Sequence, residues 1–354
     1  MRDTARRAFI ATVVVGGIVV AALALWKLKL LIAILFFAFI IAAAMRPGVD
    51  ALRRRKVPRG LGIAIHYLGL VAVLGLLLYF VVPTASEQVQ EAIPISGSEL
   101  KEETASSSGV RRQFLQAVQQ RLDDLPDADR LAERAFDPAV EITFTAFEVL
   151  IGIFFTLASA AYWIFERDRA IGLVTSLLPR PKRKIVRDTW DLIDAKLGAY
   201  VRGQLILIVL VATVLSVAFW AIGLPFWLLL AIFAGIVELI PVIGPLAAGA
   251  LAIGVGFTES LGVAIAAGMV VFVVRMVEDY LVIPRVLGEA VGLTPLTVLI
   301  AISSVTILFG GFAILLAIPL AAVVATLVDV LVRHRDPAEE TVPAVLFAAK
   351  DSEG

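Results

Sequence analysis

The chain has 354 residues, of which 60% are hydrophobic, and its mean hydropathy is +0.94. An ordinary soluble domain holds roughly 45–50% apolar residues, so this composition excludes a soluble globular protein. The 31 basic and 31 acidic residues give no net charge, and the absence of cysteine excludes disulfides, thiolate metal sites and cysteine nucleophiles.

Long apolar runs predict an all-α, polytopic membrane protein of about eight membrane segments, because a spanning helix needs roughly 20 apolar residues. The first run follows Arg2, Arg6 and Arg7, and a second run comes almost at once. We therefore expect a retained helix at the N-terminus instead of a cleaved signal peptide. The runs fall at 8–26, 30–44, 61–82, 141–165, 203–222, 226–257, 260–283 and 296–332.

Basic residues gather at the N-terminus, in residues 45–60 and in residues 166–202, which places these three parts in the cytoplasm. The acidic stretch between the third and fourth runs then lies outside and is expected to form a small extracytoplasmic helical domain. The predicted units are membrane helices over 1–82, the extracytoplasmic domain over 83–140, a fourth membrane helix over 141–165, a cytoplasmic amphipathic linker helix over 166–202, a transport core over 203–333 and a cytoplasmic tail over 334–354.

Two amphipathic helices are expected outside the apolar runs. Apolar residues at three- and four-residue spacing from Val110 to Leu125 predict one inside the extracytoplasmic domain, as a cap, a contact between subunits or part of a binding domain. The second covers 181–201, with Ile185 and Trp190 on its apolar face and a basic first turn. Such a helix suits the surface of an anionic leaflet, where it anchors the next membrane helix.

Two apolar stretches in the C-terminal third are interrupted near their middles, and each is expected to form a hairpin. The first, 226–257, breaks at Pro241–Pro245, and the second, 296–332, breaks around a tip at Gly310 and Gly311. An uninterrupted helix, 260–283, is expected between them. The charge map gives the hairpins opposite orientations, which is typical of transporters with inverted repeats and predicts a site where the two tips meet.

Glu238 is the leading candidate for a transport site. A helix that starts near Phe226 carries Glu238 roughly 18 Å along its axis, well inside a hydrocarbon core of about 30 Å. A carboxylate at that depth is costly and usually functional. Glu238 could bind a cation, exchange a proton or accept hydrogen bonds from a polar solute. The alternative is a structural ion pair with Arg275.

Other residues complete the candidate site. The break at Pro241, Gly244 and Pro245 exposes backbone carbonyls beside Glu238. Gln204, Ser303 and Ser304 are candidate solute ligands, although hydroxyls in helices most often bond their own backbone. Arg275, Glu278 and Asp279 share one helical face, either as a gate or proton relay or as an interfacial ion-pair cluster.

Familiar catalytic signatures are missing from the sequence. It contains no Walker A loop, no G-x-S-x-G and no H-E-x-x-H, and it has two histidines and no cysteine. We therefore expect no enzyme activity, no ATP-driven pump and no membrane protease. A bound metal, another cofactor and a nucleic-acid partner are not expected either.

The chain resembles the autoinducer-2 exporter (AI-2E) family of bacterial multi-pass permeases. The resemblance covers nearly the whole chain. Its motifs are Leu197–Gln204, Glu238–Pro245, Glu278–Gly288 continuing to Thr294-Pro295, and Ala317-Ile318-Pro319. Asp279 and Thr294 stand where the family often has Asn and His, so a proton-linked role is not carried over to them.

The resemblance implies a bacterial inner-membrane protein that assembles as a homo-oligomer, a pentamer being one form. Both termini are expected in the cytoplasm. Family members have been linked to export of autoinducer-2 and to sodium–proton exchange. We therefore expect efflux of a small polar solute such as autoinducer-2 by alternating access. The alternatives are antiport of a monovalent cation against protons through Glu238, and a non-transporting membrane scaffold.

Overall fold

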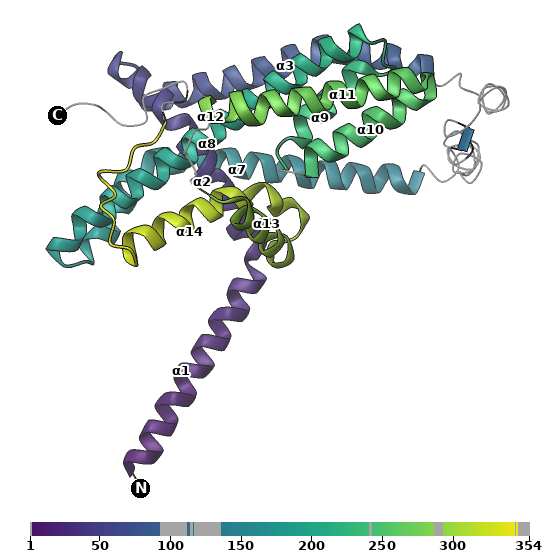
Figure 1. The fold of residues 1–354 in the computed structure, drawn as a ribbon. Helices are drawn as coiled ribbons and strands as arrows, with labels where there is room; N and C mark the ends of the chain where they lie inside the picture. The colour runs from purple at the N-terminus through teal and green to yellow at the C-terminus, as the bar shows by residue number, and fades with distance from the viewer. Residues whose placement is uncertain are drawn as a thin grey trace.

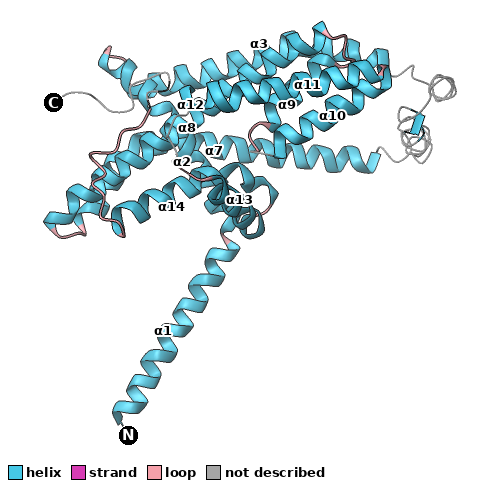
Figure 2. Ribbon diagram, in the orientation of Figure 1, coloured by secondary structure: helices cyan, strands magenta, loops and turns pink. Residues whose placement is uncertain are grey.

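The computed structural model describes residues 2–92, 112–113, 116, 136–240, 243–286, 293–343 and 345. Within these ranges all regular structure is helical, and no strand occurs (Figure 2). Six of the described helices are long and apolar enough to cross a membrane, and several shorter ones are apolar too. The prediction of an all-α, polytopic membrane protein is confirmed. The predicted amphipathic helix from Val110 to Leu125, and most of its domain, lie outside the described residues.

The N-terminal half supplies long helices that extend beyond the apolar runs from which they were predicted. Figure 1 shows the first of them projecting away from the bundle that the others form. Ala38, Val49, Ile63 and Ala160 join the next three in one buried cluster. These helices are α1 (Arg2–Lys27), α2 (Lys29–Arg54), α3 (Arg59–Ala92) and α7 (Phe136–Ser176).

The central element is α8 (Arg180–Ala221), a helix of 42 residues. At 1.5 Å per residue it is about 63 Å long, roughly twice the thickness of a hydrocarbon core. It joins the predicted amphipathic helix and the predicted fifth membrane helix into one element. The sequence across their junction, Leu197–Gly203, holds no proline that would break a helix.

The first predicted hairpin consists of α9 (Trp227–Val237) and α10 (Ile243–Glu259). It packs on the second half of α8 and on α11 (Leu261–Val277). Small side chains such as Ala231, Ala252 and Ala267 let these helices approach closely. The helix ends at Val237 and resumes at Ile243, so the prediction of a break in this apolar stretch is confirmed.

The helix expected over 260–283 is not regular, which corrects that prediction. After Val277 the backbone turns into a π-helical segment, Glu278–Val282, and then into α12 (Ile283–Val286). Pro284 has no N–H to offer an α-helical bond, so the backbone before it must shift its pairing. Single π turns inside α-helices are frequently found at functional sites.

The second predicted hairpin is α13 (Pro295–Phe309), a 3₁₀ segment (Gly311–Leu316) and α14 (Ala317–Leu331). Gly310 has φ +92°, a conformation open mainly to glycine, and confirms the break at this position. This hairpin packs on α2 and on the first half of α8, where Leu316 meets Ile40 and Leu197. The two hairpins therefore occupy different halves of α8.

After α14 the chain returns along α8. Glu340 contacts the buried Lys196 ammonium at 2.5 Å, and the backbone oxygen of Val345 accepts a hydrogen bond of 2.8 Å from Arg202 Nε. Arg202 also donates to the backbone oxygen of Ala44 at 3.1 Å. Two buried cations of α8 thus depend on a segment from the predicted cytoplasmic tail.

We expect Gly256→Ala to destabilise the first hairpin. A Cβ at Gly256 would lie 2.6 Å from the Cα of Ala264, so α10 and α11 would have to separate. Overpacking of this kind costs about 1–3 kcal/mol. The matched control is Gly249→Ala, whose Cβ meets only Val271 Cγ1 at 3.4 Å. Thermal unfolding in detergent measures both variants, and equal stability would contradict the close approach.

Candidate functional site

Glu238 lies at the point where α9 stops. Its N–H still donates to the Ala234 oxygen at 3.1 Å, and the next residues form a tighter turn, with Ile240 N donating to Val237 O at 2.9 Å. The Glu238 residue is only 7% exposed. A carboxylate is therefore held inside the protein directly beside unwound backbone. Pro241, the first proline of the predicted break, lies outside the described residues.

Gly244 allows the two halves of the hairpin to come together. It is buried in the first turn of α10, and a Cβ there would lie 1.9 Å from the backbone oxygen of Val237. Any other residue would push α10 away from the end of α9. Pro245 follows in the same first turn, where a missing N–H breaks no helical bond. Both residues shape the break, and neither adds a polar side chain to the site.

Gln204 reaches the break from α8. Its Nε2 donates a hydrogen bond of 3.1 Å to the backbone oxygen of Glu238, and the residue is 8% exposed. A free carbonyl at the end of a helix is costly in an apolar environment unless a donor satisfies it. Gln204 supplies that donor, and so ties α8 to the residue that carries the central carboxylate.

Arg275 on α11 joins three carboxylates. Its Nη1 contacts Glu238 Oε1 at 2.8 Å and Glu278 Oε2 at 3.2 Å, and its Nη2 contacts Asp279 Oδ1 at 2.9 Å. Arg275 thus contacts both Glu278 and Asp279, with which the sequence analysis placed it on one helical face. The ion pair between Arg275 and Glu238, considered above as an alternative, is also present. The first hairpin and the π-helical segment therefore meet at one guanidinium.

This cluster carries more acid than base. Three carboxylates share one arginine, and the Glu238 and Glu278 residues are 7% and 3% exposed. Glu278 Oε1 is buried and accepts no hydrogen bond. A buried, unsatisfied acceptor in an electronegative cluster is costly, and a proton or a small cation would offset that cost. Among the residues that the structure describes, no group of three or more acidic or histidine side chains has the geometry of a metal site.

The second hairpin does not contribute to this cluster. Ser303 and Ser304 are exposed on α13, and Gly310 and Gly311 form the turn that leads into the 3₁₀ segment. Because this hairpin packs on α2 and the first half of α8, its tip does not meet the break at Glu238. The hydroxyl spacing indicated polar groups in a membrane hairpin, but it held no information on which helix that hairpin would face.

A second buried ionic cluster was missed by the sequence analysis. Asp194 on α8 accepts hydrogen bonds from Arg46 on α2, at 3.0 Å, and from Arg167 on α7. Arg167 also binds Asp191. These residues fall in stretches that the charge map assigned to cytoplasmic loops. The spacing of Asp191 and Asp194, one helical turn apart, was the available signal for a shared partner.

Comparison with known proteins identifies the family of this chain. The family model described as "AI-2E family transporter" matches residues 14–333. The chain belongs to the AI-2E family. The match includes every residue of the Glu238 cluster, from Gln204 to Asp279, and it confirms the family resemblance found in the sequence.

Several known proteins are similar to this chain over most of its length. A Bacillus subtilis (strain 168) protein provisionally named transport protein YrrI is 24% identical over 85% of the chain and 86% of its own length. A second from the same strain, YueF, is 28% identical over 83% of each chain. A Mycobacterium tuberculosis (strain CDC 1551 / Oshkosh) relative is 27% identical over 94% of this chain and 91% of its own. Their provisional names also describe them as transport proteins.

Proposed function

We propose that this family member is a secondary transporter in which Glu238 and Glu278 bind the coupling ion, a proton or a monovalent cation. One observation carries the proposal: two buried carboxylates share Arg275 Nη1, and one oxygen of Glu278 has no partner. An ionisable cluster at membrane depth is costly to keep for structure alone. Its excess of acid gives an entering cation a favourable place to bind.

Arg275 provides the means of exchange. A cation or proton that neutralises Glu238 weakens the attraction between this carboxylate and the guanidinium, which keeps Glu278 and the more exposed Asp279 as partners. The break after Glu238 and the π-helical segment at Glu278 lack regular helical pairing, so both can adjust their backbone at lower cost than a continuous helix. Alternating access would then follow from movement of the first hairpin against α8 and α11.

The second candidate is efflux of a small polar solute such as autoinducer-2, coupled through the same carboxylates. The membership of the chain in the AI-2E family favours it. Carboxylate oxygens and the carbonyls of a broken helix can accept hydrogen bonds from solute hydroxyls. In both cases the proposed setting is the bacterial inner membrane, with cytoplasmic termini and several copies of the chain in one assembly.

A proteoliposome assay tests the proposal. The purified protein is reconstituted with a pH-sensitive dye inside, and a gradient of sodium or of autoinducer-2 is imposed. We expect the dye to report proton movement opposite to a sodium gradient if the coupling ion is exchanged for sodium. Proton movement only with the solute gradient would favour the second candidate. If the protein is folded and inserted but neither gradient drives proton movement, the coupling role of the cluster would be overturned.

A further inference from the structure

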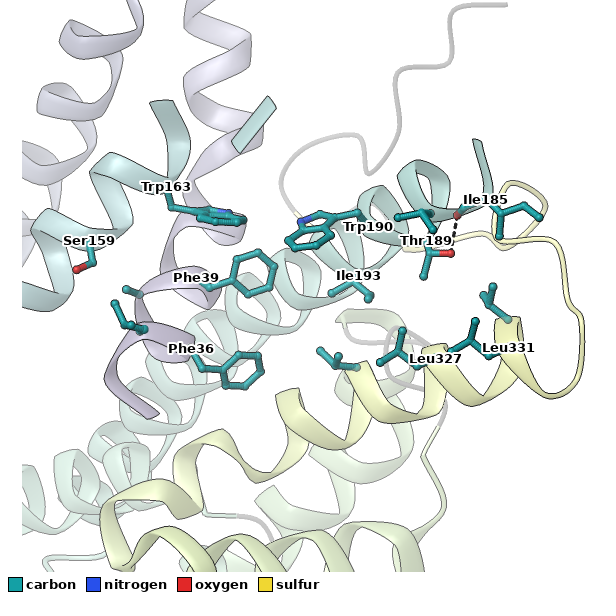
Figure 3. Close-up of a pocket in the computed structure, with 15 residues that line it drawn as sticks. Phe36, Phe39, Ser159, Trp163, Ile185, Thr189, Trp190, Ile193, Leu327 and Leu331 are labelled. Atoms are coloured by element: carbon teal, nitrogen blue, oxygen red, sulfur yellow. Dashed lines mark hydrogen bonds between the residues drawn. The ribbon is translucent and has the colours of Figure 1, made fainter. Parts of the chain in front are cut away.

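A cavity of about 740 Å³ lies between α2, α7, α8 and α14 (Figure 3), and no residue of the Glu238 cluster lines it. Its volume falls inside the range of roughly 300–1,000 Å³ that is typical of ligand pockets. Phe36, Phe39 and Trp163 lie toward one end, and Ile185 and Leu331 lie toward the other. The cavity is therefore elongated, and its lining comes from the first half of α8, not from the half that holds Gln204.

The lining is mostly apolar, which suits a hydrocarbon chain. The side chains are apolar or aromatic except for Ser159 and Thr189, and the Thr189 hydroxyl already donates to the Ile185 oxygen at 2.7 Å. Four rings, those of Phe36, Phe39, Trp163 and Trp190, form the aromatic part. Phe39 lies edge-on to Trp163 at 5.4 Å, and Trp190 is stacked on Trp163 at 5.9 Å between centroids. A void among such groups loses dispersion contacts unless an apolar guest fills it.

The cavity opens at the surface of the protomer. Leu35, at the end near the start of α2, is 43% exposed, and Leu331 at the other end is 67% exposed. Both belong to helices that are long and apolar enough to span a membrane. A lipid chain can therefore enter sideways from the bilayer.

The end marked by Ile185 and Leu331 is basic. At about 100° per residue, Lys182 falls in the middle of the stripe of α8 that lines the cavity through Ile185, Val186, Thr189 and Ile193. Arg183 is turned away to the backbone oxygens of Ser176 and Leu178. Beyond Leu331, Arg333 and Arg335 are already paired with Asp329. Lys182 therefore lies on α8 one turn before Ile185, in register with the residues that line the cavity and at the end where a lipid phosphate would lie.

We propose that this cavity binds one acyl chain of an anionic phospholipid, with the lipid phosphate at Lys182. The site is separate from the proposed transport site and does not depend on it. Lys184 provides a matched control, because it lies on the opposite side of the same turn of α8 from Lys182.

Tryptophan fluorescence tests the site, because Trp163 and Trp190 line the cavity and bromine quenches indole at short range. The full-length chain is prepared with Trp26, Trp220 and Trp227 replaced by phenylalanine and placed in phosphatidylcholine bilayers. Increasing mole fractions of dibrominated phosphatidylglycerol or dibrominated phosphatidylcholine are then added. We expect half-maximal quenching at about five-fold lower mole fraction for the anionic lipid, the preference that one basic residue gives at a membrane surface.

The ratio of the half-maximal mole fractions for the two lipids should fall toward one in Lys182→Gln and stay about five-fold in Lys184→Gln. If the triple tryptophan variant does not fold, native mass spectrometry of the otherwise unchanged protein provides the same comparison through retained phosphatidylglycerol. Equal quenching by the two lipids, or an unchanged preference in Lys182→Gln, would overturn the proposal. Protection from both lipids would also overturn it, because a second copy of the chain would then fill the cavity.

Discussion

Replacing Glu238 by glutamine should reduce ion-coupled transport at least about 100-fold, in line with the effect of removing a group that must carry a proton. The amide keeps the size of the side chain but loses its charge. It can still bond to Arg275, which retains Glu278 and Asp279 as charged partners at 3.2 and 2.9 Å. The variant should therefore fold, and the loss should appear in flux.

The measurement is the rate of dye response in proteoliposomes that contain equal amounts of inserted protein. Glu259→Gln is the matched control, since this exposed acid at the end of α10 belongs to the same hairpin and lies outside the cluster. Its rate should equal that of the unchanged protein. Normal cation transport by Glu238→Gln would show that the coupling ion binds elsewhere. Partial survival of solute flux, with proton movement lost, would identify a solute route that does not need the titratable group.

Replacing Arg275 by methionine should destabilise the protein by about 3–5 kcal/mol, the usual cost of removing one partner from a buried ion pair. Glu238 and Glu278 would lose the guanidinium that both contact, and both are buried. Arg275→Lys should be less damaging because it keeps the charge, although one ammonium cannot serve three carboxylates with the geometry of a guanidinium. Unfolding in detergent, followed by circular dichroism, measures each variant.

Two further variants make this result specific. Adding Glu238→Gln and Glu278→Gln to Arg275→Met should recover much of the lost stability, because no buried charge is then left unpaired. Arg285→Met is the control for loss of an arginine, since this residue is exposed at the end of α12. If Arg275→Met proved as stable as Arg285→Met, the guanidinium would not be holding the hairpin to α11.

The contact between Glu238 and Arg275 could be predicted from the sequence, because a charged side chain inside a membrane has few possible partners. Glu238 is the one acid inside its apolar stretch, and Arg275 is the one base inside the next, so each needs a partner in the protein. The breaks in both hairpins followed from proline and glycine for a similarly local reason. The π-helical segment at Glu278 could not be predicted so directly, because a proline inside a helix can be accommodated by a kink, a break or a shifted hydrogen bond.

Long-range packing was the harder part to predict. The sequence places Ser303 and Ser304 in an apolar hairpin but does not specify which helix that hairpin packs on. In the structure it packs on α2. Asp194 falls in the predicted amphipathic helix 181–201, where the charge pattern indicated a membrane surface and no buried ionic cluster. Its partners, Arg46 and Arg167, come from two other helices and are 148 and 27 residues away in the sequence. Pairings of that kind depend on how helices cross, which one sequence does not specify.

The continuity of α8 limits how this transporter can move. The Asp194 cluster, Lys196, Arg202 and Gln204 all lie on this single helix, and no turn or bend separates them in the described backbone. A rigid rod of about 63 Å that tilts by about 10° around its middle carries each end through about 5 Å. Release of Gln204 from the Glu238 carbonyl by a motion of α8 would therefore strain the salt bridges at Asp194 and the tail contact at Arg202 in the same stroke. The conformational change at the proposed ion site would in this way be felt on the far side of the protein.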